Sequence, residues 1–279
     1  MAIRLACADA AFPLLEHDDC LRLIGMLGVE GVDIGLFEER SKLQPSMVFG
    51  APEKNGQALR REAAENGLEV ADVFFQPALD FVAFSLNHPE ANIREKSRDD
   101  FLKTLAYAMA AESYHVTVLP GVHHDGEPYE DSLARASEEL SWRVGQAGAA
   151  GISFGVEAHI GSIAETPDKV LALLGMTPGL SLTLDYTHFM RQHIANEEVH
   201  PLIGHASHFH ARGGAAGRLQ TMMSENEIDY PAIASEMKRT GYGGYIGLEY
   251  TWNDWEDCNR TDNLSETILL RDGLRALGV

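Results

Sequence analysis

Residues 152–188 read ISFGVEAHIGSIAETPDKVLALLGMTPGLSLTLDYTH and contain two strand patterns separated by one helix pattern. The runs at 152–159 and 180–186 are short and apolar and end in polar residues, which is typical of buried strands. Thr166 is followed by a proline, a pair suited to the N-cap and first position of a helix, which we predict over 166–174. The stretch therefore predicts a strand–helix–strand unit with parallel strands.

The same alternation continues in both directions along the chain. Further strand patterns occupy residues 3–8, 31–36, 68–75, 115–120, 206–211 and 245–250. Further helix patterns occupy residues 14–27, 51–66, 89–113, 129–149, 197–202, 230–240 and 264–277. Strict alternation predicts a parallel sheet covered by helices. Eight such units in 279 residues match the size of a (β/α)8 barrel.

An open, doubly wound sheet is the alternative architecture. Such a sheet often carries a glycine-rich turn after its first strand, whereas residues 10–13 read AAFP here. The chain also shows no linker-like, repeated or low-complexity stretch. We therefore predict a single α/β domain, a TIM barrel, over residues 1–279.

Composition and charge exclude several functional classes. Hydrophobic residues make up 45% and charged residues 23%, as in ordinary globular proteins, and no apolar run approaches the ~20 residues that span a bilayer. The formal charge of −20 repels phosphate backbones. The 3 cysteines are too scattered for a disulfide framework. We expect a cytoplasmic protein that binds neither nucleic acid nor membrane.

Polar residues end the last four predicted strands. They are Glu157 and His159 on the fifth, Asp185 and His188 after the sixth, His208 and His210 on the seventh, and Glu249 on the eighth. The carboxyl ends of barrel strands meet at one rim, so these side chains should converge. Unpaired carboxylates inside an apolar barrel are costly, and their convergence predicts a neutralising cation. Oxygen-rich ligation with one imidazole suits Mn²⁺, Mg²⁺ or Co²⁺.

Each of these residues, taken alone, also has a purely structural explanation. His159 or His208 could be a hydrogen-bonded core histidine, Asp185 could begin a turn, and Glu249 could pair with an arginine. Of the two histidines on the seventh strand, we expect His210 at the metal, because it lies nearer the rim. Four coincidences on four successive strands favour the metal site.

These residues also carry a resemblance to a known family. The chain resembles the sugar isomerase/epimerase superfamily with the xylose isomerase-like barrel, which includes ketose 3-epimerases, hydroxypyruvate isomerase-like proteins and inosose dehydratases. The resemblance rests on Glu157, the D-x-x-H motif of Asp185 and His188, the H-x-H motif ending at His210, and Glu249. It covers nearly the whole chain and implies the same barrel fold.

The resemblance also implies roles for these residues. It implies one divalent metal, with Mn²⁺ expected and Mg²⁺, Co²⁺ or Zn²⁺ as alternatives, bound by Glu157, Asp185, His210 and Glu249. It further implies that Glu157 and Glu249 act as the acid/base pair and that His188 holds a substrate oxygen. Self-association or pairing with a second subunit is left open.

One position departs from the ketose epimerase pattern. The epimerase arginine lies six positions after the metal histidine, where this chain has Ala216. Arg212 and Arg218, in a glycine-rich loop, are the nearby candidates for substrate binding. We also assign His123 to substrate binding, and Trp252 to an apolar wall against a sugar face.

The sequence therefore predicts a metal-dependent isomerase or epimerase that acts on a ketose or sugar derivative through an enediolate. The first alternative is a lyase or dehydratase on the same scaffold, including a C-glycoside-cleaving type, for which His159 is a candidate base. The second alternative is a non-catalytic sugar-binding barrel. The expected partner in all three cases is a small carbohydrate.

Overall fold

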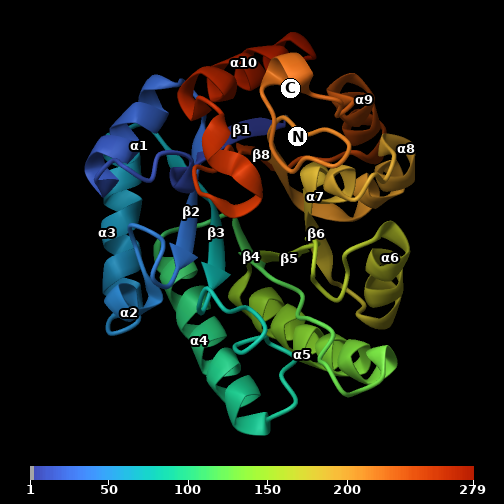
Figure 1. The fold of residues 1–279 in the computed structure, drawn as a ribbon. Coiled ribbons are helices and arrows are strands. Elements are labelled where there is room, and N and C mark those ends of the chain that lie inside the picture. The colour runs from blue at the N-terminus through green and yellow to red at the C-terminus, as the bar shows by residue number, and fades with distance from the viewer. Residues whose placement is uncertain (1–2) are drawn as a thin grey trace.

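A computed structural model describes residues 3–279. Eight parallel strands follow one another in chain order and close into a barrel, because β8 pairs with β1 (Figure 1). The strands are β1 (Arg4–Ala8), β2 (Gly31–Phe37), β3 (Glu69–Gln76), β4 (His115–Val118), β5 (Ser153–Glu157), β6 (Ser181–Asp185), β7 (Ala206–Ala211) and β8 (Tyr245–Leu248). The predicted α/β barrel is confirmed, and the open-sheet alternative is excluded.

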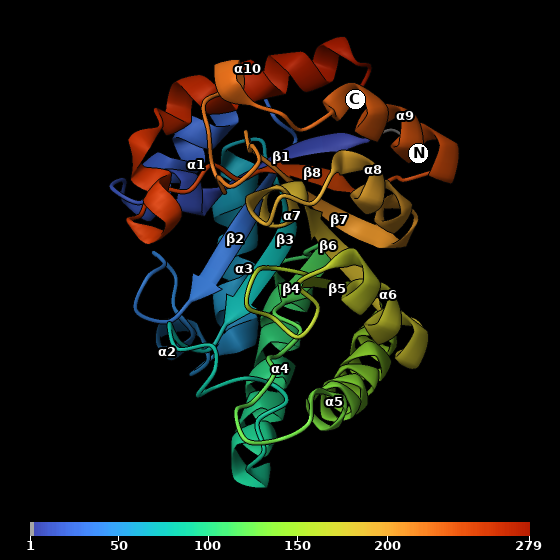
Figure 2. The ribbon, with the colours of Figure 1, turned by 45° about the vertical axis from the view of Figure 1, so that its right-hand side comes forward.

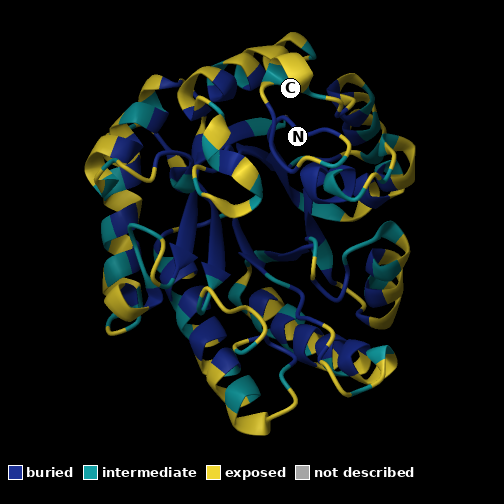
Figure 3. Ribbon diagram, in the orientation of Figure 1, coloured by how far each residue is buried: buried dark blue, intermediate teal, exposed yellow. Residues whose placement is uncertain are grey.

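The helices form the outer layer of the barrel (Figures 1 and 2). They are α1 (His17–Met26), α2 (Pro45–Val48), α3 (Pro52–Glu65), α4 (Ala91–Ala110), α5 (Tyr129–Ala150), α6 (Pro167–Met176), α7 (Tyr186–Arg191), α8 (Asn196–Val199), α9 (Tyr230–Thr240) and α10 (Asn263–Ala276). Their exposed residues lie on the outward faces, while the strands are almost wholly buried (Figure 3). No helix within residues 3–279 is both long enough and apolar enough to cross a membrane.

The segment between β6 and β7 differs from the prediction of one helix over 197–202. It contains the short helices α7 and α8, followed by a 3-10 helix over His200–His205. Pro201 lacks the backbone N–H that would continue the α-helical hydrogen bonds of α8, so the chain tightens into 3-10 turns there. This break leaves α7 directly after Asp185, which accepts a hydrogen bond from the backbone of Thr187.

The barrel interior is polar for most of its depth. Asp72 on β3 pairs with His115 on β4 at 2.8 Å, and Asp33 on β2 pairs with His208 on β7 at 3.0 Å. Burial lowers the pKa of His115 and opposes the ionisation of Asp72, but the hydrogen bond from His115 prevails and lowers the pKa of Asp72. A Cβ atom at Gly247 would collide with the carboxylate of Asp33. These paired groups form a rigid floor beneath the rim.

The helices α3 and α4 approach each other so closely that only glycine fits at the contact. Gly56 in α3 faces α4, and a Cβ atom at Gly56 would collide with the carbonyl oxygen of Tyr107. Gly145 in α5 has open space around it instead, with nothing within 4 Å of its built Cβ atom.

Substitution of these two glycines by alanine should therefore have opposite effects. Gly56→Ala should lower the free energy of unfolding by about 1–3 kcal/mol because the helices must separate. Gly145→Ala should raise it by about 0.5–1 kcal/mol because alanine restricts the unfolded chain. Urea unfolding of both variants checks this, and equal signs for the two changes would contradict the described α3–α4 contact.

Candidate metal and active site

The predicted acidic and histidine residues converge at the carboxyl ends of β5 to β8. Each strand delivers its residue at its last or penultimate position or just beyond it, and all are buried: Glu157, Asp185, His210 and Glu249. The period-2 alternation of the strands turns these side chains into the barrel rather than toward the helices. The hollow above them measures about 800 Å³, including space open to solvent.

Two glutamates contact the same imidazole. Nδ1 of His210 lies 2.7 Å from Oε1 of Glu157 and 3.5 Å from Oε2 of Glu249. One ligand atom from each of the three residues lies within 4.8 Å of the other two. One nitrogen and two carboxylate oxygens at this spacing can share a single divalent cation.

Asp185 is held by a second set of contacts. Its Oδ2 lies 2.8 Å from a guanidinium nitrogen of Arg212, and its Oδ1 accepts hydrogen bonds from the backbone and hydroxyl of Thr187. Nε2 of His188 lies 3.6 Å from Asp185 and 3.9 Å from Glu157. Asp185, His188 and Glu157 form a second possible set of metal ligands, and Glu157 belongs to both sets. Arg212 is bonded to Oδ2 of Asp185 and would compete with a cation for that oxygen.

The electrostatics of the cluster show an excess of negative charge. Burial raises the pKa of the Glu249 carboxyl to about 7, and the nearby charges of Glu157 and Asp185 act in the same direction. Burial also opposes ionisation of Glu157, but the hydrogen bond and charge of His210 lower its pKa to about 2. Burial would lower the pKa of His210, yet the two glutamates raise it well above its usual value.

These shifts fit a divalent cation. Asp185 and Glu249 lie within ion-pair distance of Arg212, and the charge of Arg40, which also lines the hollow, acts on Glu249 and Glu157 from farther away. Protons on His210 and Glu249 offset negative charge within the cluster itself. A divalent cation among Glu157, His210 and Glu249 would supply the missing positive charge and displace those protons. The donor set, oxygen-rich with one imidazole, matches Mn²⁺, Mg²⁺ or Co²⁺.

His159 and His188 lie beside the cluster. Both are buried, and their ring centroids are 5.8 Å apart. Burial lowers the pKa of His159, and burial lowers the pKa of His188 to about 4. Nδ1 of His159 lies 2.6 Å from the carbonyl oxygen of Ile160, so that nitrogen carries the proton and Nε2 is an acceptor. Both residues line the hollow, where sequence analysis placed them.

Three residues assigned to substrate binding are not brought into this hollow. Arg218 is half exposed and pairs with Glu225, because the glycine-rich loop turns outward beyond Gly217. His123 is held by the carbonyl oxygen of Glu127. Trp252 lies in an adjoining hollow lined by Asp9 and Lys42, among others. These three side chains therefore lie outside the lining of the metal hollow, whereas Arg212 lies within the cluster.

Sequence analysis missed several residues of the hollow, and Phe74 and Arg40 are the two that lie near the charged cluster. Phe74, on the inward face of β3, lies 5.8 Å from the ring of His210. The inward-facing Asp72 two residues earlier is the signal that could have placed it. Arg40 also lines the hollow, from the loop after β2. Nothing in the local pattern marks Arg40, because a loop has no period that fixes its side-chain direction.

Comparison with known protein families agrees with this architecture. Residues 21–272 match the model of the family described as "Xylose isomerase-like TIM barrel". The chain belongs to this family. The match begins in α1 and ends in α10, so it includes every strand from β2 to β8 and all of the cluster residues.

Similar proteins are mainly isomerases and epimerases. A 2-oxo-tetronate isomerase of Pectobacterium atrosepticum is 26% identical over 164 residues, which span 56% of this chain and 62% of that protein. A D-psicose 3-epimerase of Clostridium cellulolyticum, solved with D-tagatose, has a TM-score of 0.78 at 14% identity and covers 99% of both chains. An L-ribulose 3-epimerase has a TM-score of 0.76 at 16% identity, covering 99% of this chain and 96% of its own. At these identities the two solved structures show a shared fold.

Another similar structure belongs to a different class of enzyme by its description. The probable 3-DHS dehydratase AsbF of Bacillus anthracis has a TM-score of 0.69 at 14% identity, covering 96% of this chain and 99% of its own. The fold thus accommodates proteins described as epimerases and as a dehydratase. The chemistry of this chain must be argued from its own residues.

The raised pKa of Glu249 predicts a pH-dependent metal affinity. Cation binding must displace the proton of His210 across the neutral range and, below pH ~7, the proton of Glu249 as well. The association constant for Mn²⁺ should therefore fall about tenfold more per pH unit below pH ~7 than above it. Isothermal titration calorimetry of metal-stripped protein between about pH 5.5 and about pH 8, a range that brackets this pKa, measures the change.

Two variants give this prediction its controls. Glu249→Gln should weaken binding and remove the extra steepness below pH ~7, because only His210 then releases a proton. Glu225→Gln, at an exposed ion pair outside the cluster, should bind Mn²⁺ as the unmodified chain does. A pH-independent association constant in the unmodified chain would contradict the described charge balance.

Proposed function

We propose that this chain is a divalent-cation-dependent isomerase or epimerase that acts on a keto-sugar or a related sugar derivative. The observation that carries the proposal is the pair Glu157 and Glu249, two buried carboxyl groups that contact one imidazole and have pKa values of about 2 and about 7. Environments that separate two carboxyl pKa values in this way provide one base and one acid at the same pH.

Glu157, His210 and Glu249 would form the cation site. Asp185 would be a fourth ligand if its Oδ2 atom, which is bonded to Arg212, also bound the cation. When bound, the cation would offset the negative charge that develops on the substrate after proton removal beside a carbonyl. The nearly dry surroundings strengthen this effect, because all four side chains are buried.

Residues of the chain would transfer the protons, orient the substrate and line the hollow. Glu157, ionised at neutral pH, would take the proton beside the carbonyl. Glu249, ionised once the cation is bound, would take up a proton from solvent and deliver it to the carbon from another direction, and Glu157 would then release its proton to solvent. Arg212 and His188 would orient substrate oxygens from the side of Asp185. Phe37, Phe74 and Trp255 would form the apolar walls of the hollow against sugar carbons.

A lyase reaction is the second candidate, and His159 favours it. Its Nε2 is an unprotonated acceptor at the edge of the hollow, and no hydrogen-bond partner for that atom lies among residues 3–279. A neutral imidazole with a lowered pKa could accept a proton or return one to a leaving group. Elimination would begin with the same proton removal as isomerisation, and a leaving group would then depart in place of reprotonation at carbon.

Incubation with ketoses in deuterated water tests the proposal. We expect Mn²⁺-loaded protein to convert at least one of D-psicose, D-tagatose, L-ribulose or 2-oxo-tetronate and to leave deuterium at the reacting carbon, detected by NMR. Glu157→Gln and Glu249→Gln should each lower the rate by about 10²-fold or more, because a positioned acid or base is lost.

Glu225→Gln is the matched control and should retain the full rate, since its carboxylate lies at the surface. Loss of water or of a substituent without a recovered labelled sugar would favour the lyase. Sugar binding without any exchange, in Mn²⁺-loaded protein, would refute both catalytic hypotheses and leave a binding barrel.

A further inference from the structure

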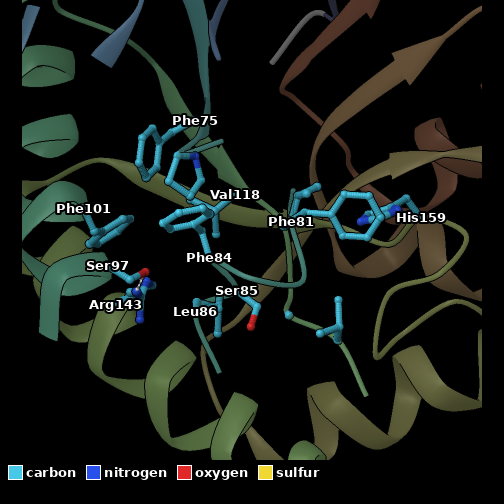
Figure 4. Close-up of a pocket in the computed structure, with 14 residues that line it drawn as sticks. Phe75, Phe81, Phe84, Ser85, Leu86, Ser97, Phe101, Val118, Arg143 and His159 are labelled. Atoms are coloured by element: carbon cyan, nitrogen blue, oxygen red, sulfur yellow. Dashed lines mark hydrogen bonds between the residues drawn. The ribbon is translucent and has the colours of Figure 1, made fainter. Parts of the chain in front are cut away.

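A second, apolar pocket opens beside the metal cluster. It measures about 480 Å³, including the space at its mouth, and lies between β3, β4, α4, α5 and the loop that follows β3. Four phenylalanines line it: Phe75, Phe81, Phe84 and Phe101. Figure 4 shows Phe75, Phe84 and Phe101 together at one side and Phe81 beside His159 at the other.

The polar groups of this pocket are already engaged with one another. Arg143, fully buried in α5, lies 2.9 Å from the carboxylate of Glu139 and 2.8 Å from the hydroxyl of Ser97 (Figure 4). Its guanidinium also stacks over the ring of Phe101, at 5.4 Å. The hydroxyl of Ser85 is bonded to Nε2 of His124 at 3.0 Å. Such a lining suits an uncharged occupant, because a carboxylate or phosphate would be buried against a cation that is already neutralised.

The pocket and the metal hollow share a boundary. Phe81, Leu119 and His159 line both. The ring of Phe81 stands edge-on to the imidazole of His159, with centroids 5.3 Å apart and planes at 89°. These three residues therefore form the wall between the two cavities, and a molecule that fills both must displace the exposed side chain of Phe81.

His159 marks the boundary with an open acceptor. It is 5% exposed, and among residues 3–279 its Nε2 has no hydrogen-bond partner, although Nδ1 is bonded to Ile160. A buried acceptor without a partner is costly, and a ligand hydroxyl that reached Nε2 by displacing Phe81 would remove the cost. The occupant of the two cavities should therefore carry a hydroxyl between its sugar part and its apolar part.

We propose that the substrate is a sugar derivative that bears an uncharged aromatic group, with the ring in the phenylalanine-lined pocket and a hydroxyl at Nε2 of His159. The sugar portion of this proposal rests on the proposed function, whereas the ring site rests on the pocket alone. Aromatic rings pair edge-to-face with phenylalanines more favourably than alkyl chains of equal area, which selects a ring over an aliphatic group.

A binding experiment in metal-free protein isolates the ring site. Fluorine NMR of 4-fluorophenol, titrated with protein in excess EDTA, should show saturable binding with a Kd on the order of 1 mM. 4-Fluorobenzoate should bind about tenfold more weakly. Its carboxylate would lose its hydration in the pocket, and the nearby guanidinium of Arg143 is already paired with Glu139. Tighter binding of the benzoate would overturn the proposal and would indicate that Arg143 binds anions in this pocket.

Variants in one loop supply the matched comparison. Phe84→Ala, at a half-exposed pocket residue, should weaken 4-fluorophenol binding about tenfold, while Val82→Ala, nearby in the loop but outside the pocket lining, should leave it within about twofold. Circular dichroism verifies that both remain folded. Absence of saturable binding, or equal binding by both variants, would refute the ring site.

The sugar portion is tested separately. Derivatives of the converted sugar that carry a hydroxybenzyl group, with the hydroxyl on the carbon that joins sugar and ring, should bind Mn²⁺-loaded protein more tightly than the sugar itself. Phe84→Ala should remove this gain in affinity. If 4-fluorophenol binds and no ketose exchanges deuterium, the ring site stands and the proposed function fails. If ketoses exchange deuterium and 4-fluorophenol does not bind, the proposed function stands and the ring site is refuted.

Discussion

The constraint on which the site depends is the burial of three carboxylates at the ends of neighbouring strands. Glu157, Asp185 and Glu249 are all buried and cannot all remain ionised without compensating positive charge. The structure meets this need with Arg212 at Asp185, with a charged His210 at Glu157, and with a proton on Glu249 near neutral pH. The last two are the compensations that a divalent cation would replace.

The layers below the rim explain why the cluster keeps its shape. Two buried acid–histidine pairs lie in the barrel beneath the cluster: Asp33 on β2 with His208 on β7, and Asp72 with His115 on the neighbouring strands β3 and β4. His208 stands edge-on to His210, with ring centroids 5.3 Å apart, so the floor fixes the orientation of the imidazole above it. Gly247 makes room for this floor, since any side chain there would displace Asp33. A rigid floor of this kind is what a preorganised site requires.

The sequence predicted the barrel and the main cluster because both follow from short-range patterns. Strand periodicity and polar strand ends place Glu157, Asp185, His210 and Glu249 at one rim without knowledge of any contact. The contacts that modify the cluster are long-range, and no local pattern reveals them. The pairing of Arg212 with Asp185 joins different strands, and the outward turn at Gly217 that removes Arg218 depends on loop packing.

The charge balance at the rim leads us to expect one divalent cation among Glu157, His210 and Glu249. Anomalous X-ray diffraction from crystals of the chain soaked in Mn²⁺ would locate that cation. We expect one anomalous peak within about 2–2.5 Å of a ligand atom of each of these three residues. A peak elsewhere, or none at saturating Mn²⁺ with the Arg212–Asp185 and Glu157–His210 pairs intact, would show that protons and arginine side chains alone balance the buried carboxylates.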